Sequence, residues 1–520
     1  MRPEHPTGTL LSPSPADRLS IALAFAGLVL LWLFSRSAIV GTLTTFERVN
    51  GSISVEEFAW ASPSVVLRNL PASAAAEGVT LVGRAPHDQN WTIECGTSLR
   101  MIVNVRGGYF RQSLPSSRAC LQTGITVSSD WSVIPGASIG SRDMRALSFQ
   151  LYEVRLGAVS LPLAEIGTSA DGLYGVEKIA LRNDAQGTLT GKWDAAWYKG
   201  IATNGYQFDG DRGRQQNAAW PFLYPMLAKA LAAITGIPIA KAMLDLNAGL
   251  VLVSLFAIFL LGREMRLSVP AAMIAPAWIA CNPFAYFLFG GFSEALFLVL
   301  ECAFVLLLIH KQYGLAVCVI ALLGATRFVG CLAIVWLLLA LWRAGALQGR
   351  SRWPKAVAIA GAGFLGVATD IGIKWYQTGY PYAAFSVRSA WPVTPFGQWA
   401  EMFQVQRLAQ GEYVPLLLLS FATLGYCILV GLDEMRRSAR DPYVQASAVA
   451  TFVVSVTLLL NPELHSVGRY MLPLAPALVG ALAVPRWHPY TMVLLPTITV
   501  LGAIYLPLVV MRIANGLPPY

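Results

Sequence analysis

Charged residues are scarce in this chain of 520 residues: 13% are Asp, Glu, Lys or Arg, whereas 55% are hydrophobic. Soluble globular proteins carry about a quarter charged residues. This composition therefore excludes an ordinary soluble enzyme, as well as the disordered, collagen-like and disulfide-scaffold classes. Because only a lipid solvent tolerates so much outward-facing apolar surface, we predict a polytopic membrane protein. Most of the basic excess behind the net charge of +9 lies in short loops, where Lys and Arg set membrane orientation, so no nucleic-acid partner is expected.

Cysteine is also sparse, with seven residues and no CxxC or Cys/His metal spacing. The five cysteines from Cys281 to Cys427 lie in or beside apolar runs and are interpreted as small core residues. Cys95 and Cys120 lie in the one large polar segment and can form a disulfide if that segment is exported. The sequence leaves the paired and the free form open. Phosphate-binding glycine loops and metal-ligand clusters are missing, so we expect no metal and no other cofactor.

Long apolar runs are abundant. The first extends from about residue 19 to 40, after Arg2 and Arg18. The Ser-Arg-Ser-Ala stretch at 35–38 allows a cleaved signal peptide, but we favour an uncleaved first span. Ten more runs follow near residues 239–262, 270–289, 293–310, 314–325, 328–342, 355–376, 413–432, 443–460, 470–484 and 490–512. We therefore predict a mostly α polytopic protein with about eleven transmembrane helices, although several runs are shorter than the roughly 20 residues that cross a bilayer.

The distribution of basic residues predicts the orientation of these spans. Threading them alternately places one set of basic residues on the side of the N-terminus: Arg263, Arg266, Lys311, Arg343, Arg350, Arg352, Lys355, Arg436, Arg437, Arg440 and Arg486. The opposite loops are longer and hold fewer. By the positive-inside rule the N-terminus is cytoplasmic and the segment after the first span is exported. The same rule favours a helix break near Arg327. The Ala-rich, Lys-poor composition suggests a bacterial inner membrane, with export to the periplasm.

The segment 42–190 differs in character from the rest. Short runs of alternating polarity lie at 64–67, 79–82, 91–94, 101–105, 125–127 and 147–156, separated by Asn, Gly, Ser and Pro. This spacing predicts a periplasmic β-sandwich, inserted between a tail with the first transmembrane helix (1–41) and a transmembrane catalytic region (191–520). Residues 145–156 resemble the last strands of carbohydrate-binding-like domains attached to bacterial glycosyltransferases. A carbohydrate-binding domain and a spacer without a ligand both remain open.

The most informative stretch is 192–206, Lys-Trp-Asp-Ala-Ala-Trp-Tyr-Lys-Gly-Ile-Ala-Thr-Asn-Gly-Tyr. Read as a helix, Trp193 and Trp197 fall on one face, which suits the membrane interface. Asp194 and Tyr198 share a neighbouring face. A carboxylate at the outer interface can meet both a lipid-linked substrate and a water-soluble hydroxyl group. The alternative is that Asp194 only caps the helix.

At this point the sequence resembles a known family. Trp193-Asp194-Ala195, with Tyr198 after it, is similar to the PIG-V type of GPI mannosyltransferase and its bacterial relatives, which are GT-C membrane glycosyltransferases. Further landmarks follow in the family's order: Ala-Trp-Pro-Phe-Leu-Tyr-Pro at 219–225, Asn-Pro at 282–283, Phe-Ser-Glu-Ala-Leu-Phe at 292–297, Ala-Thr-Arg-Phe-Val-Gly at 325–330, and His465 with Arg469-Tyr470. The set covers about residues 190 to 475. The insertion before the first motif departs from the pattern and leaves the acceptor open.

The resemblance implies transfer of a sugar, mannose in that family, from a polyprenyl-phosphate donor to a glycan or glycolipid hydroxyl on the outer face of the bilayer. Asp194 is then the general base of an inverting reaction. The charge of the leaving lipid phosphate needs cations, and the implied ones are Lys192, Arg327, His465 and Arg469. The other implied substrate-binding residues are Tyr198, Glu294 and Tyr470.

Structural alternatives exist for several of these residues. Glu294 can cap its helix, Arg469 can snorkel at a helix end, and His465 can satisfy a loop backbone. Asp370 and Lys374, four residues apart, are expected to form a structural ion pair. Two other functions compete with transfer. A flippase or transporter of lipid-linked sugars would want inverted repeats, and none is apparent in the sequence. A non-catalytic anchor for the sandwich would not need eleven spans.

Overall fold

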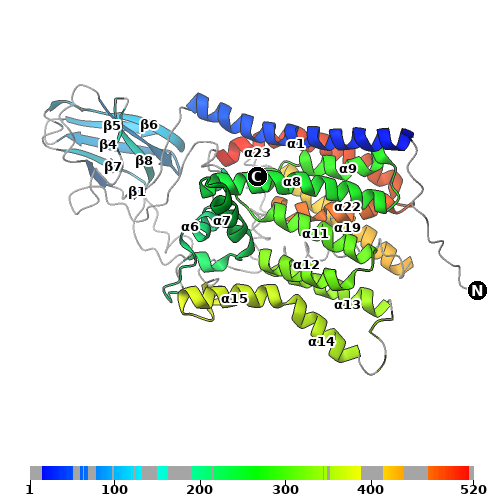
Figure 1. Ribbon diagram of the computed structural model, residues 1–520. Helices are drawn as coiled ribbons and strands as arrows, with labels where there is room; N and C mark the ends of the chain where they lie inside the picture. The colour runs from blue at the N-terminus through cyan, green and yellow to red at the C-terminus, as the bar shows by residue number, and fades with distance from the viewer. Residues whose placement is uncertain are drawn as a thin grey trace, which may run out of the picture.

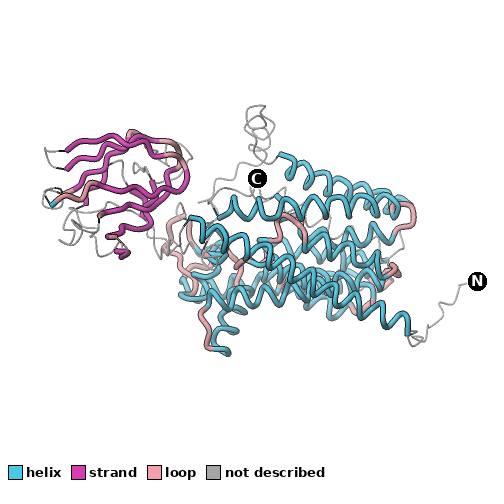
Figure 2. The backbone as a smooth tube through the Cα atoms, turned by 90° about the horizontal axis from the view of Figure 1, so that it is seen from above, coloured by secondary structure: helices cyan, strands magenta, loops and turns pink. Residues whose placement is uncertain are grey.

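The computed structural model describes most of the chain. The described residues are 15–50, 59–61, 64–67, 78–95, 99–118, 120, 124–131, 149–157, 159–161, 189–191, 193–212, 215–343, 345–347, 349, 352–387, 414–437 and 467–514. They form a mostly helical body with a smaller domain of β-strands at one end of it (Figure 1). Seen from above, the strands again lie beyond one end of the helices (Figure 2).

The helical body is built from long and short apolar helices. They are α1 (Pro15–Asn50), α6 (Trp193–Asn204), α7 (Leu223–Thr235), α8 (Ile239–Glu264), α9 (Val269–Ala280), α10 (Tyr286–Phe289), α11 (Glu294–Ile309), α12 (Tyr313–Thr326), α13 (Ala333–Arg343), α14 (Arg352–Gly363), α15 (Leu365–Thr378), α16 (Ala383–Ser386), α19 (Val414–Arg437), α21 (Val467–Tyr470), α22 (Ala475–Ala483) and α23 (His488–Ala514), with 3-10 helices η1 (Asn217–Ala219), η2 (Phe328–Leu332) and η5 (Leu472–Leu474). The first helix ends at Asn50, beyond the domain boundary predicted at residue 41.

Length and composition allow three of the described helices to cross a membrane: Leu19–Thr44 within α1, α8, and His488–Met511 within α23. The pair α14 and α15, bent by 45°, would make a fourth span if it counts as one. Several other apolar helices are shorter than a full bilayer crossing needs. The predicted run at 443–460 lies outside the described residues. The count of eleven spans therefore stays a prediction.

Two helix breaks place polar groups inside this apolar body. The predicted span at 270–289 is interrupted, because α9 ends at Ala280 and Pro283 cannot donate a helical hydrogen bond. The Asn282 side chain instead accepts a hydrogen bond from the Phe284 amide at 2.9 Å. The second break follows α12, where Arg327 has an extended backbone with φ −149° and ψ 133°. This break lies where the distribution of charge predicted it.

The strands form two antiparallel sheets. They are β1 (Ala59–Ala61), β2 (Ser64–Leu67), β3 (Val79–Ala85), β4 (Gln89–Cys95), β5 (Leu99–Val105), β6 (Gly108–Leu114), β7 (Ile125–Ser129), β8 (Phe149–Leu156) and β9 (Val159–Leu161). One sheet has the order β1-β8-β3-β6 with β9 beside β8, and the other has the order β2-β7-β4-β5. Trp91 of β4 is fully buried and contacts Phe110 of β6 and Phe149 of β8, with ring centroids 4.8 and 4.5 Å away. The sheets therefore pack face to face as a sandwich.

A disulfide links Cys95, the last residue of β4, to Cys120. Both cysteines are buried in the sandwich core. The sequence left this pairing open, and the structure shows it. Disulfides persist in oxidising compartments, so the bond agrees with the predicted export of this segment.

Candidate functional site

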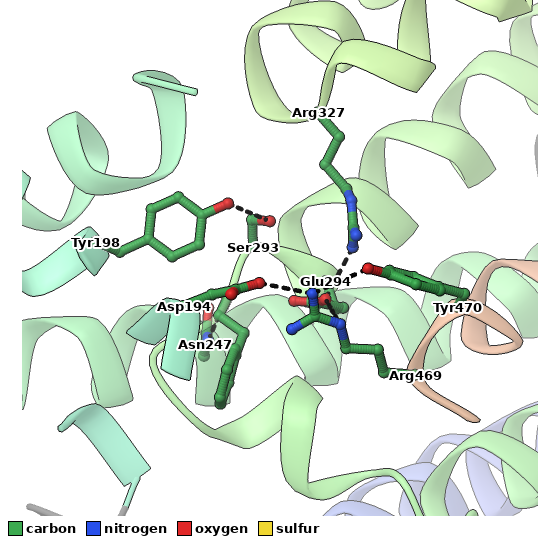
Figure 3. Close-up of polar contacts among 9 residues, drawn as sticks. Asp194, Tyr198, Asn247, Ser293, Glu294, Arg327, Arg469 and Tyr470 are labelled. Carbon is green, nitrogen blue, oxygen red and sulfur yellow. Dashed lines mark hydrogen bonds and ion pairs between the residues drawn. The ribbon is translucent and has the colours of Figure 1, made fainter. Parts of the chain in front are cut away.

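Six of the eight predicted site residues lie together where several helix ends meet (Figure 3). The six are Asp194, Tyr198, Glu294, Arg327, Arg469 and Tyr470, and their contacts define the charge cluster discussed below. They come from α6, α11, the break after α12, and α21, which are far apart in the sequence. Lys192 and His465 lie outside the described residues. In Figure 1, α6 occupies the end of the helical body that is near the strands.

Asp194 is the most accessible ionisable group of the charge cluster. It lies in the first turn of α6, and 25% of its side chain is exposed. Its Oδ2 atom is 2.6 Å from Nη2 of Arg469, whose side chain is only 8% exposed. A carboxylate gains stability at a helix N-terminus from the helix dipole, and a buried guanidinium needs a carboxylate partner. The two residues therefore stabilise each other's charged form.

Glu294 is a buried carboxylate that contacts both arginines of the charge cluster. It begins α11, and its side chain is 3% exposed. Its Oε1 atom accepts a hydrogen bond from Nη1 of Arg327 at 2.8 Å and lies 3.4 Å from Nε of Arg469. A carboxylate at this depth is tolerated because two cations pair with it. We therefore interpret Glu294 as a residue that positions both guanidinium groups, and its contact with substrate stays a prediction.

Aromatic rings contact both guanidinium groups. The central carbon of Arg327 lies 5.2 Å from the ring centroid of Tyr470, and that of Arg469 lies 5.0 Å from the same centroid. The Arg469 guanidinium also lies over Phe287, at 5.6 Å, and donates to the Tyr470 hydroxyl at 3.2 Å. Cation–π contacts of this kind favour Arg over Lys. The two arginines that pair with Glu294 therefore also share an aromatic neighbour, Tyr470.

Tyr198 is one turn of α6 beyond Asp194 and is buried. Its hydroxyl donates to Oγ of Ser293 at 3.0 Å. Burial, followed by the nearby Asp194 carboxylate, raises the pKa of Tyr198 above its ordinary value. The phenol is therefore a neutral hydrogen-bond donor that ties α6 to the start of α11.

Sequence reasoning missed two residues that shape this region. Asn247 of α8 is fully buried, and its side-chain amide donates to the carbonyl oxygens of Gly290 and Phe292, the latter at 2.9 Å. These bonds fix the loop that precedes Glu294. The sequence did contain one indication of Asn247: a side-chain amide lies within the apolar run 239–262. Such a polar group is costly in lipid unless it has hydrogen-bond partners. Phe287, the platform under Arg469, carried no signal, because phenylalanine is common in apolar runs.

Asp370 and Lys374 form the ion pair expected from their spacing, at 2.5 Å. They lie on α15 and are buried, and Oδ1 of Asp370 also accepts from the Phe222 amide at 3.0 Å. Lys374 lies 5.1 Å from the ring centroid of Tyr206. The pair thus anchors α15 to the loop that follows α6, outside the charge cluster.

Because this pair is buried, we expect Lys374→Met to lower the free energy of unfolding by about 3–5 kcal/mol, since it leaves the Asp370 charge without its cation. The matched control is Lys241→Met, which removes an exposed pair of the same spacing and distance with Asp245 and should cost about 1 kcal/mol or less. Thermal or denaturant unfolding of the purified protein measures both. The double variant Asp370→Leu/Lys374→Met should recover much of the loss. Equal effects of the two lysine variants would contradict the buried-pair interpretation.

No group of three or more His, Cys, Asp or Glu side chains within the described residues is arranged to hold a metal ion. Among those same residues, the charge cluster combines two carboxylates with two guanidiniums. Such a set can accept a proton at the exposed carboxylate and bind an anion at the guanidiniums.

No family model matches the chain, and no curated protein matches it. Among solved structures it is similar to the oligosaccharyltransferase of Archaeoglobus fulgidus in complex with zinc and sulfate, with a TM-score of 0.34 and 13% identity over 62% of this chain and 48% of that one. The apo form gives a TM-score of 0.33 and 13% identity, over 62% and 52% of the two chains. The archaeal oligosaccharyltransferase AglB from the same organism, in complex with an inhibitory peptide and a dolichol-phosphate, gives 0.32 and 12%, over 62% and 51%.

The chain spans about half the length of these structures. At such low scores and identities the similarity assigns neither a fold nor an activity.

Proposed function

We propose that this protein is a GT-C-type membrane glycosyltransferase of the PIG-V kind. It transfers a hexose, mannose, from a polyprenyl-phosphate donor to a hydroxyl group of a glycan or glycolipid. The observation that carries the proposal is the charge cluster: a partly exposed carboxylate, Asp194, beside two buried guanidinium groups, at one end of an apolar helical body. A lipid-linked donor matches this arrangement, because its lipid tail suits the apolar helical body and its phosphate suits the guanidinium groups.

Asp194 is the general base. Its carboxylate is the one most open to an incoming acceptor, since Glu294 is 3% exposed and Asp194 is 25% exposed. It removes the proton from the acceptor hydroxyl as the oxygen attacks the anomeric carbon from the face opposite the phosphate. The bond from that carbon to the phosphate oxygen breaks, and its electron pair stays with the phosphate. The sugar is transferred with inversion.

Arg327 and Arg469 stabilise the leaving phosphate. The donor carries a phosphodiester, which gains one negative charge as the sugar departs, and preorganised cations stabilise developing charge in a site shielded from water. Side-chain exposures of 16% and 8% give both arginines that shielding. Glu294 keeps the two guanidiniums together through its contacts with both.

The contact of Arg469 with Asp194 couples donor binding to the base. In the structure, Arg469 pairs with Asp194 at 2.6 Å. A phosphate that enters the charge cluster competes for the same guanidinium, because Arg binds phosphate and carboxylate oxygens in the same geometry. The carboxylate is then freed to accept a proton. This order of events limits proton removal to the donor-bound state.

The test is a transfer assay with the full chain in proteoliposomes, supplied with undecaprenyl-phosphate mannose and a water-soluble mannoside as acceptor. We expect a disaccharide with inverted anomeric configuration and release of undecaprenyl phosphate. Movement of the intact donor between leaflets without sugar release would overturn the proposal in favour of a flippase. A product with retained configuration would overturn the role of Asp194.

We place the charge cluster on the periplasmic side of a bacterial inner membrane, with the N-terminus in the cytoplasm. Support comes from the disulfide of the nearby sandwich and from basic residues at the opposite helix ends. In a Cys318→Ser background, a membrane-impermeant maleimide applied to intact spheroplasts should label Thr203→Cys on α6 and spare Gln312→Cys before α12. Both positions are exposed, and Cys318 is the exposed free cysteine of the described residues. The reverse labelling pattern would put the site in the cytoplasm.

A further inference from the structure

Trp193, the residue directly before Asp194, has an unusual backbone. Its φ angle is +49°, and among the described residues only Arg266 and Lys311 share a positive φ without being glycine. This left-handed region is strained for a bulky side chain, and such a backbone persists only where the surrounding residues hold it in place. Such residues gather at sites of function, and here the strained residue adjoins the proposed base.

The indole of Trp193 packs against another aromatic ring and is also exposed. It stacks on Phe287, with ring centroids 6.0 Å apart and planes at 27°. Phe287 is buried and also supports the Arg469 guanidinium. Trp193 itself remains 39% exposed. Trp193 therefore presents an exposed indole on Phe287, which also contacts the Arg469 guanidinium that pairs with Asp194.

An ordinary interfacial tryptophan does not need this arrangement. Anchoring in the headgroup region is satisfied by a regular helical backbone with the ring at the bilayer surface, as the spacing of Trp193 and Trp197 predicted. Trp197 instead stacks on Trp220, with centroids 5.0 Å apart, and its backbone is not among those with positive φ. The two tryptophans thus have different surroundings, and only Trp193 is both strained and next to the charge cluster.

A pyranose ring matches an exposed aromatic surface on the residue next to the carboxylate residue. One face of the ring presents C–H groups, which pack on an indole, while the hydroxyl groups point outward around the rim. With the C–H face on Trp193, a rim hydroxyl can reach the neighbouring carboxylate. An acyclic hydroxyl compound has no such face, and neither does a serine side chain.

We propose that Trp193 is the platform for the acceptor and that the acceptor is a glycan ending in a pyranose. This inference rests on the proposed function, narrows its acceptor hydroxyl to one on a terminal pyranose ring, and adds the residue that orients that ring. Trp193 is a specificity-determining residue: it orients the ring whose hydroxyl Asp194 deprotonates. It does not bind the donor phosphate, which the arginines hold.

The test is saturation-transfer NMR with the full chain in nanodiscs, using methyl α-D-mannopyranoside and glycerol as probes. We expect saturation of the ring C–H protons in the wild type and little in glycerol. Trp193→Ala should weaken pyranoside binding by about five- to tenfold, in line with aromatic packing, and Trp193→Phe should keep most of it. Trp197→Ala is the matched control and should leave the signals unchanged. Binding of undecaprenyl phosphate should be the same in all variants.

The outcomes separate this inference from the proposed function. Equal pyranoside signals in the wild type and Trp193→Ala, equal signals for glycerol, or no pyranoside binding at all would overturn the platform. A parallel loss of undecaprenyl phosphate binding in Trp193→Ala would show a merely structural role. Asp194→Asn should retain pyranoside binding while it loses transfer. Pyranoside binding that depends on Trp193 in a protein without transfer activity would uphold the platform and reject the transferase.

Discussion

We expect Asp194→Asn to lower the rate of sugar transfer by about 10²–10⁴-fold, the usual contribution of a general base. Asparagine has nearly the shape of aspartate and can still accept a hydrogen bond from Arg469, but it cannot take up a proton at the pH of the assay. The fold should therefore survive. The measurement is the initial rate of disaccharide formation in proteoliposomes, at saturating undecaprenyl-phosphate mannose.

The matched control for this variant is Asp245→Asn on α8. Asp245 is exposed and pairs with Lys241, away from the charge cluster, so the control should transfer at the wild-type rate. The unfolding temperatures of both variants show whether the fold is intact. Full transfer activity in Asp194→Asn would reject the proposed mechanism.

Arg469→Met is expected to lower kcat by about 10²–10³-fold, as the loss of a preorganised charge-stabilising group does elsewhere. The guanidinium contacts Asp194, Glu294 and Tyr470, and in the proposed reaction it stabilises the leaving phosphate. Arg469→Lys keeps the charge but loses the planar guanidinium that donates two parallel hydrogen bonds. Its rate should therefore lie between those of Arg469→Met and the wild type. Steady-state kinetics with varied donor concentration separate kcat from KM.

Arg486→Met provides the comparison for this series, because Arg486 is exposed and pairs with Asp433. It should leave transfer unchanged. If Arg469→Met also transfers at the wild-type rate while its unfolding temperature is preserved, then Arg469 does not stabilise the leaving group. A lysine variant with full activity would show that charge alone suffices there.

Periodicity predicted much of the fold because each element carries its own signal. Alternating burial marks β4, whose residues are inward and outward in turn, and the apolar runs mark the helices. The strand β6 (Gly108–Leu114) was missed, because Arg111, Gln112 and Ser113 hide the alternation, and the strand is defined by its pairing with β3. The helix break at Arg327 was predicted from the distribution of charge, because one unbroken helix would place the basic residues from Arg343 to Lys355 on the outer side.

The site was predictable in its members but not in its contacts. The motif resemblance named Asp194, Arg327 and Arg469, yet it treated the arginines as free cations for a phosphate. In the structure each guanidinium already has a carboxylate partner. Packing over hundreds of residues decides which helix ends meet. No local pattern in the sequence indicates these contacts. For the same reason the strained backbone of Trp193 had no signal beyond the residue itself.

The charge cluster is formally neutral, because two acidic and two basic side chains cancel within a few ångströms. Opposite charges so close together produce little field beyond about one Debye length, so the charge cluster should not draw anions from the water by long-range steering. For the proposed lipid-linked donor, capture then depends on lateral diffusion of the lipid within its leaflet. Its encounter rate should follow the lipid's density in the bilayer and respond little to ionic strength.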